Sequence, residues 1–209
     1  MENAIPFLFE IAVLIFSVVI HEVAHGYAAL ALGDHTAEHE GRLTLNPAKH
    51  IDPFGSVILP AVSYLLGGVI VGWAKPVPYN PHHLRNRKWG PAMVGMAGPA
   101  ANIMLALVFG LAVRFSAMQV SAFWASFSAI AGTVALLNLT LAFFNLVPIP
   151  PLDGSKVLFA LLPLRFRGIM VFLEQYGFIL LLLFIFFLSG ILLPIVSLFF
   201  RLIVGAGPF

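Results

Sequence analysis

The chain has 209 residues, of which 60% are hydrophobic and only 10% are charged, and its mean hydropathy is +0.99. Soluble domains are about half apolar and a quarter charged, so this composition excludes an ordinary soluble protein and indicates one that spans a membrane. The formal net charge of +2 is too small for a nucleic-acid-binding protein, and the lack of cysteine excludes disulfides and thiolate metal sites.

The first apolar run predicts a helix from about Pro6 to Leu32. Proline suits the first turn of a helix, and Gly33 suits the position just beyond a helix end. The first ten residues contain two glutamates and no Lys or Arg, so we expect the run to stay in the membrane instead of being cleaved as a signal peptide. In the polar segment that follows, at 34–52, the sequence "GRLTL" is predicted to form a short strand.

The second apolar run, at 54–72, is interrupted by Pro60, Gly67 and Gly68. A run of this kind either spans the membrane or enters it and returns on the same side, and its own sequence leaves both arrangements open. A basic loop with several prolines follows it and ends near residue 90.

Two more spanning helices are predicted, from about Pro91 to Phe115 and from about Ala122 to Val147. In the first of them, Gly98 lies among alanines, which is typical of close packing between membrane helices. The second ends in "NLVPIPPLDG", where three prolines must stop a regular helix. After a short amphipathic segment, the apolar run at 177–204 predicts either one long kinked span or two short ones.

The first helix contains the sequence HEVAH at 21–25. The i, i+4 spacing places His21 and His25 on one helix face, so both imidazoles can bind one Zn²⁺. Glu22 lies beside the first ligand, where its carboxylate can act as the general base for a metal-bound water. Ionisable groups inside a membrane helix are costly and usually functional or paired, which favours a metal site over the alternative of a structural polar cluster.

A catalytic zinc site needs a third protein ligand beside its open position. The other histidines lie in polar loops, whereas Asp153 follows an apolar span in the segment broken by prolines. Irregular backbone at membrane depth must be surrounded by protein or by a water-filled cavity. We therefore expect Asp153 to be the third ligand; the alternative is an aspartate at the interface that caps the next helix.

Asp153 can reach the two histidines only if the helix that precedes it runs in the same direction as the first helix. This requires 54–72 to be re-entrant, because a full span would reverse the direction. Nine of the eleven cations then lie on one side of the membrane, which the positive-inside rule identifies as cytosolic. These nine are Arg42, Lys49, Lys75, Arg85, Arg87, Lys88, Lys156, Arg165 and Arg167.

Three motifs, HEVAH, GPAAN and NLVPIPPLDG, in this order on successive spans, resemble the site-2 protease family of intramembrane zinc metalloproteases. The resemblance implies one catalytic Zn²⁺ bound by His21, His25 and Asp153. It also implies that Asn102 and Asn145 lie near the active site, in substrate binding or transition-state support, with a helix–helix hydrogen bond as the alternative for each. Asn138 lies outside these motifs, and we expect it to be a packing residue.

The resemblance completes the predicted architecture: an all-α polytopic membrane protein whose residues 1–209 form one domain. Three transmembrane helices carry HExxH, GPAAN and LDG, beside a re-entrant or short β element. The catalytic core is expected at about 7–162, and one or two C-terminal spans at about 170–205. The sequence has no room for a PDZ-like or CBS-like domain, so the resemblance is to small prokaryotic members.

The implied function is hydrolysis of peptide bonds within or near transmembrane segments of other proteins, as in regulated intramembrane proteolysis. The expected location is the prokaryotic inner membrane, with the active site toward the cytosolic half and no nucleic acid among the partners. A strand from "GRLTL" or from 69–79 could pair with an unwound substrate. The alternative is a metal-ion transporter or channel that uses the His and Asp residues as a transit site, although no internal repeat is visible.

Overall fold

A computed structural model describes residues 4–58, 74–116 and 121–205. Within these residues the structure is helical and contains no strand, which confirms the predicted all-α class. Four stretches of it are long and apolar enough to span a membrane: Leu8–Ala31, Gly90–Ser116, Ala122–Asn145 and Arg167–Val204. The elements are α1 (Ala4–Ala31), α2 (Thr36–His39), η1 (Pro47–Lys49), η2 (Pro53–Ile58), α4 (Gly90–Ser116), α5 (Ala122–Asn145), α6 (Gly154–Leu161), η3 (Leu164–Phe166), α7 (Arg167–Leu183), η4 (Phe184–Leu188), η5 (Ser189–Ile191) and α8 (Leu192–Val204).

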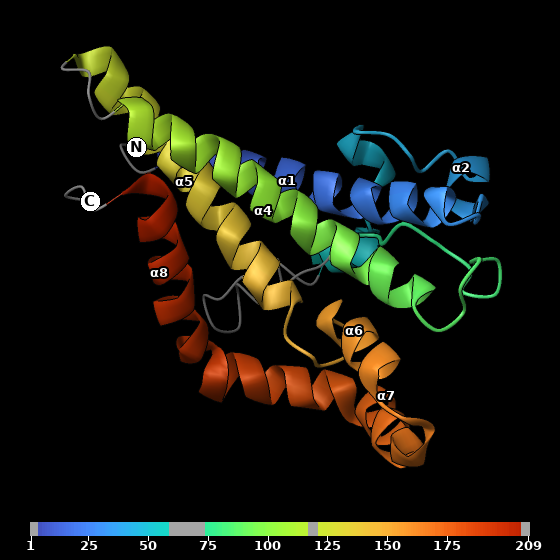
Figure 1. Cartoon of the computed structure of the whole chain (residues 1–209). Coiled ribbons are helices and arrows are strands. Elements are labelled where there is room, and N and C mark those ends of the chain that lie inside the picture. Colours follow the sequence, from blue (N-terminus) through green and yellow to red (C-terminus); the bar gives the residue numbers. More distant parts are fainter. Residues whose placement is uncertain (1–3, 59–73, 117–120, 206–209) are drawn as a thin grey trace.

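The centre of the molecule is formed by α1, α4 and α5, and α4 packs against both of the others (Figure 1). Small buried residues such as Ala106, Ala131 and Ala135 allow the helices to approach closely. Residues further along α4 contact earlier residues of α1 and also earlier residues of α5. Both neighbouring helices are therefore antiparallel to α4. Helices α1 and α5 therefore run in the same direction, as the third-ligand argument requires.

The chain that connects α1 to α4 returns to the side from which it left. Gly33, with a φ of 103°, ends α1 as predicted, and the N–H of Arg85 donates to the carbonyl of Leu32 at 3.0 Å. The N–H of Lys75 likewise donates to the carbonyl of His50 at 2.8 Å. The C-terminal end of α1 and the start of α4 therefore lie together. The re-entrant element predicted within 54–72 lies mostly outside the described residues and stays a prediction.

The strand predicted at "GRLTL" is wrong, because residues 41–45 form no strand. Residues 41–45 contact the segment at 75–76 through a side chain and not through the backbone hydrogen bonds of a sheet. The guanidinium of Arg42 donates through Nη2 to the carbonyls of Lys75 and Pro76, at 2.9 and 3.2 Å. The described part of the second predicted strand, 74–79, is also irregular.

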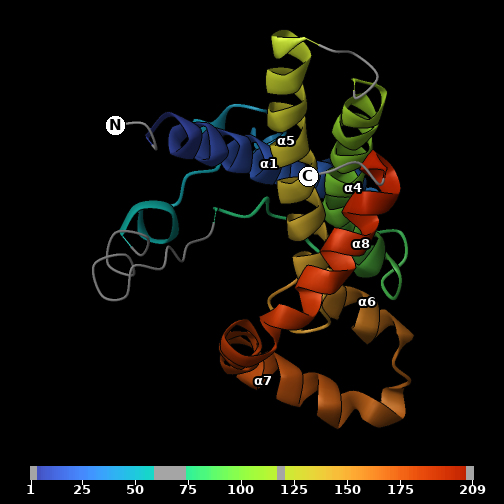
Figure 2. The same cartoon turned by 90° about the vertical axis from the view of Figure 1, so that its left-hand side faces the viewer.

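The C-terminal apolar run is bent between Phe184 and Ile191, and its two helices point in different directions (Figures 1 and 2). Helix α8 packs against α4 and α5. Helix α7 packs against the proline-rich loop that follows α5, where a Cβ at Gly177 would lie 2.6 Å from the carbonyl oxygen of Pro150. The bend lies where a kink or a turn was predicted, near Ser189 and Gly190, and the choice between one kinked span and two short ones stays a prediction. Helix α7 supports the loop that carries Asp153.

Candidate active site

Three side chains from distant parts of the sequence meet between α1, α4 and the loop after α5. His21 and His25 project from one face of α1, with their Nε2 atoms 3.0 Å apart. Asp153 Oδ2 lies 3.0 Å from the Nε2 of His21 and 3.1 Å from that of His25. All three residues are buried. The structure thus brings together the three predicted ligands as one group that could hold a metal ion.

The far side of each imidazole is bound to a carbonyl oxygen. His21 Nδ1 donates to the side-chain Oδ1 of Asn102, and His25 Nδ1 donates to the backbone oxygen of Val94, each at 2.6 Å. A carbonyl oxygen can only accept, so the proton of each neutral ring lies on Nδ1 and the lone pair on Nε2. Two lone pairs and a carboxylate oxygen then face one another at 3.0–3.1 Å. Such a set is repulsive unless a cation lies among its members, which is the condition of a metal site.

One carboxylate oxygen of Asp153 faces the two histidines, and the other binds the ammonium group of Lys156. Its Oδ1 accepts a hydrogen bond from Lys156 Nζ at 2.9 Å, one turn along in α6. Gly154 follows Asp153 directly, and a Cβ there would collide with the backbone of Leu146 and Val147. The loop therefore folds back tightly onto the end of α5, which explains why the motif has glycine after the aspartate.

Gly98 of α4 faces the two imidazoles directly. A Cβ at this position would lie 2.5 Å from His25 Nε2 and 2.6 Å from His21 Nε2. The sequence suggested close helix packing for this glycine. The structure shows that a side chain at this position would enter the space beside the Nε2 atoms of the two histidines.

Glu22 lies beside the three predicted ligands, in a cavity of about 170 Å³. Its Oε2 accepts a hydrogen bond from the backbone N–H of Val77 at 2.8 Å, and this holds the carboxylate against the segment 74–79. The cavity is lined by His21, Glu22, His25, Pro76, Val77, Tyr79, Asn145, Pro151, Asp153 and Lys156. A carboxylate in this place can exchange a proton with water in the cavity.

The two asparagines predicted near the active site lie in different surroundings. Asn145 lines the cavity, and its Nδ2 donates to the carbonyl of Leu141 at 2.9 Å. Asn102 is fully buried behind His21, away from the cavity lining. It contacts the far nitrogen of a predicted ligand. A role in substrate binding or transition-state support stays a prediction for both asparagines, of which Asn145 lines the cavity. Lys156 and Val77 were not singled out from the sequence, because only the fold brings them to the site.

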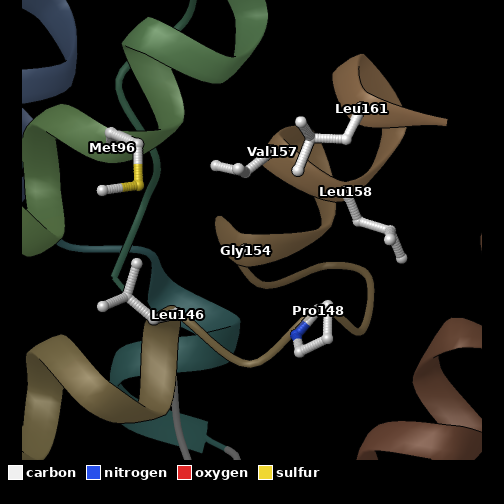
Figure 3. Close-up of a pocket in the computed structure, with 7 residues that line it drawn as sticks. All are labelled: Met96, Leu146, Pro148, Gly154, Val157, Leu158 and Leu161. Carbon is white, nitrogen blue, oxygen red and sulfur yellow. The ribbon is translucent and has the colours of Figure 1, made fainter.

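An apolar pocket of about 210 Å³ lies next to this part of the chain (Figure 3). It is formed by the end of α5, the loop beyond it, α6 and one methionine of α4. Its lining consists of Met96, Leu146, Pro148, Gly154, Val157, Leu158 and Leu161. The polar cavity and the apolar pocket thus both take lining residues from the segment 145–161.

A buried carboxylate outside the membrane-spanning helices anchors the segment that runs past the site. Burial of Asp34 alone would raise its pKa, but hydrogen bonds from Thr36 and from the backbone N–H of Asn80 hold the pKa below its usual value. The Asn80 bond is 2.6 Å long. Asp34 therefore ties the loop after α1 to the end of the segment that holds Glu22.

Comparison with known proteins identifies the family of the chain. The sequence profile of Peptidase family M50 matches residues 111–189, which include Asp153. The chain is 38% identical over 181 residues to the "Putative zinc metalloprotease YwhC" of Bacillus subtilis, covering 85% of this chain and 78% of that protein.

The chain belongs to peptidase family M50, the site-2 proteases. It is also 34% identical over 174 residues to the "Putative zinc metalloprotease Rip2" of Mycolicibacterium smegmatis, covering 83% of this chain and 64% of that protein. The "Zinc metalloprotease MJ0392" of Methanocaldococcus jannaschii is 26% identical over 79% of this chain and 38% of its own length. No solved structure matches the chain significantly.

Membership of the M50 family confirms several predictions made from the sequence. The chain is an integral membrane protein and a zinc metalloendopeptidase. The donor set of two neutral imidazoles and one carboxylate is one that zinc favours in catalytic sites. This assignment favours the peptidase over the transporter.

Proposed function

We propose that this M50 peptidase cleaves peptide bonds within or near membrane-spanning segments of other proteins, as an agent of regulated intramembrane proteolysis. The observation that carries the proposal is the convergence of His21, His25 and Asp153 beside Glu22, inside a bundle of apolar helices. We assign the two histidines and Asp153 as the zinc ligands. All of these residues lie within the predicted core of about 7–162.

Bound zinc would supply a Lewis acid that lowers the pKa of water and polarises the scissile carbonyl. The chain's own groups supply the proton transfer. Glu22 takes a proton from the attacking water and delivers it to the leaving amine. Its Oε2 is held by the Val77 N–H, and Oε1 is assigned as the proton acceptor. Asn145 is assigned to contact with the substrate, because its amide lines the same cavity.

The surroundings of the site favour an apolar substrate. The polar cavity supplies water, while the apolar pocket beside it offers a surface for the side chains of a membrane-spanning segment. A peptide bond in such a segment is protected by lipid and by its own helix, so the substrate must unwind locally before it is cut. The segment 74–79 runs past Glu22 and offers backbone groups to which an unwound chain could pair.

The distribution of charge supports an active site in the cytosolic half of a prokaryotic inner membrane. Nine of the eleven cations lie in the segments around the C-terminal end of α1 and after α5. The other two, Arg114 and Arg201, lie in the last turns of α4 and α8. These two helix ends lie together, since Arg114 Nη1 donates to the carbonyl of Leu202. The metal group lies toward the end of the bundle that is rich in cations.

The direct test replaces Glu22 by Gln in the full-length protein. Glu22→Gln should retain zinc, because no ligand changes, and should lose about 10²- to 10⁴-fold in cleavage, because the base is removed. Zinc is measured on the purified protein. Cleavage is measured by comparing membrane proteomes for proteins that accumulate and for new termini inside membrane-spanning segments.

Glu10→Gln is the matched control, since Glu10 is an exposed glutamate on the same helix. This control should leave both zinc content and the proteome unchanged. His25→Ala should lose zinc as well as cleavage. Unchanged cleavage in Glu22→Gln, or full zinc content in His25→Ala, would contradict the assignment.

A further inference from the structure

A chain of buried amide groups crosses three helices behind His21. His21 Nδ1 donates to Asn102 Oδ1 at 2.6 Å, and Asn102 Nδ2 donates to Asn138 Oδ1 at 2.7 Å. Asn138 Nδ2 in turn donates to the hydroxyl of Ser17 at 2.9 Å, back on α1. Both asparagines are 0% exposed. This row of hydrogen bonds therefore links α1, α4 and α5 at the level of the proposed zinc ligands through buried groups.

Backbone carbonyls determine the direction of these hydrogen bonds. A carbonyl oxygen only accepts, so the Val134 oxygen, 2.9 Å from Asn138 Nδ2, requires the amide nitrogen on that side. Asn138 Oδ1 therefore faces Asn102 and accepts from its Nδ2. The carbonyl of Ser17, at 3.3 Å, is a second acceptor for the same Nδ2. Asn102 must then turn its Oδ1 toward His21.

We infer that Asn138 is a positioning residue for the zinc centre. It holds the amide of Asn102 in the one orientation that keeps the His21 proton on Nδ1 and directs the Nε2 lone pair at the site. The inference rests on the proposed role of His21 as a zinc ligand. Partners on the far nitrogen of a ligating histidine commonly control metal affinity. Here the control extends one residue further, to an asparagine outside the family motifs and outside the cavity lining.

If the role of Asn138 were purely structural, its hydrogen bond to Asn102 would serve only to hold α4 to α5. Another side-chain contact between the same two helices provides a comparison for that role. Ser116 Oγ and Ser128 Oγ are 2.7 Å apart and join the same two helices near the opposite end. This contact touches no proposed ligand. Ser128→Ala is therefore a matched control that removes a bond between α4 and α5 and leaves His21 as it is.

The test measures zinc affinity by competition with a chelator, on the full-length protein in detergent. Leucine has the same branched arrangement of side-chain heavy atoms as asparagine and makes no hydrogen bond. Asn102→Leu should weaken zinc binding about 100-fold and Asn138→Leu about tenfold, the range found for outer-shell partners. The double variant should lie within about twofold of Asn102→Leu, because Asn138 reaches the zinc only through Asn102. Ser128→Ala should bind zinc as the unaltered protein does.

Two results would overturn the inference. One is unaltered zinc affinity in Asn138→Leu. The other is a double variant whose fold-loss of zinc affinity equals the product of the fold-losses of the two single variants. If Asn138→Leu does not fold, Asn138→Ser removes the same contact with a smaller side chain and should give the same loss. His21→Ala in the same assay tests the proposed ligand itself: retained zinc there refutes the proposed function, whereas its loss with unaltered Asn138 variants refutes only this inference.

Discussion

Gly98→Ala adds one methyl group and should weaken the proposed zinc site. The added Cβ would lie 2.5–2.6 Å from the Nε2 atoms of His25 and His21. Ordinary van der Waals contacts begin at about 3.4 Å, so the methyl group would be about 0.9 Å too close to the nearer nitrogen. The rings have little freedom to withdraw, because their Nδ1 atoms are already bound to Asn102 and to the Val94 carbonyl at 2.6 Å.

The expected loss follows from the cost of such overpacking, which is typically about 1–3 kcal/mol. If the zinc-bound state carries this strain, zinc affinity should fall about 5- to 150-fold, since about 1.4 kcal/mol corresponds to a factor of ten. Chelator competition on purified protein measures the affinity, and thermal unfolding in detergent measures the stability. Cleavage should fall with the zinc content.

Two other glycines separate this effect from general damage. A Cβ at Gly110, also in α4, would lie 2.6 Å from Ile203, so Gly110→Ala should lower stability and leave zinc affinity unchanged. A Cβ at Gly132 would meet only Phe200, at 4.0 Å, and Gly132→Ala should be neutral or slightly stabilising. Unaltered zinc affinity in Gly98→Ala, or an equal loss in Gly110→Ala, would refute the reasoning.

Two further predictions concern the groups around the site. Lys156→Met removes the cation bound to Asp153 Oδ1 and should weaken zinc binding about tenfold in chelator competition, whereas the same change at exposed Lys49 should have no effect. Asp34→Asn should lower the free energy of unfolding by about 1–3 kcal/mol at neutral pH, because charge-assisted hydrogen bonds are lost. Since the folded pKa of Asp34 lies below the unfolded value, its stabilisation should be full at neutral pH and fade as the pH falls through that range. Thermal unfolding against pH should therefore bring the Asp34→Asn and unaltered proteins together in acid, and a constant difference would contradict this.

The sequence by itself determined the membrane class and the described spanning helices, and it named the three residues of the candidate metal group that the structure brings together. Helix α1 ends one residue before the predicted end, and α4 and α5 agree within two residues. These features are local, because hydropathy, helix period and proline or glycine stops act within a short stretch of chain. The meeting of Asp153 with the histidines was predictable because charge and helix direction restrict the topology.

The tertiary structure decided the roles that depend on which helices are neighbours. Asn102 was predicted near the active site or in a helix–helix hydrogen bond, and it lies behind His21 and bonds to Asn138 of another helix. Asn138 was predicted to be a packing residue and continues this row of hydrogen bonds. The strand predicted at 41–45 does not form, because a strand needs a partner that no local pattern can supply. Gly98 faces the ligand nitrogens only because α4 crosses α1 at that level. The role of a side-chain amide or a glycine depends on the groups that it contacts. These contacts are set by packing between helices that are far apart in the sequence.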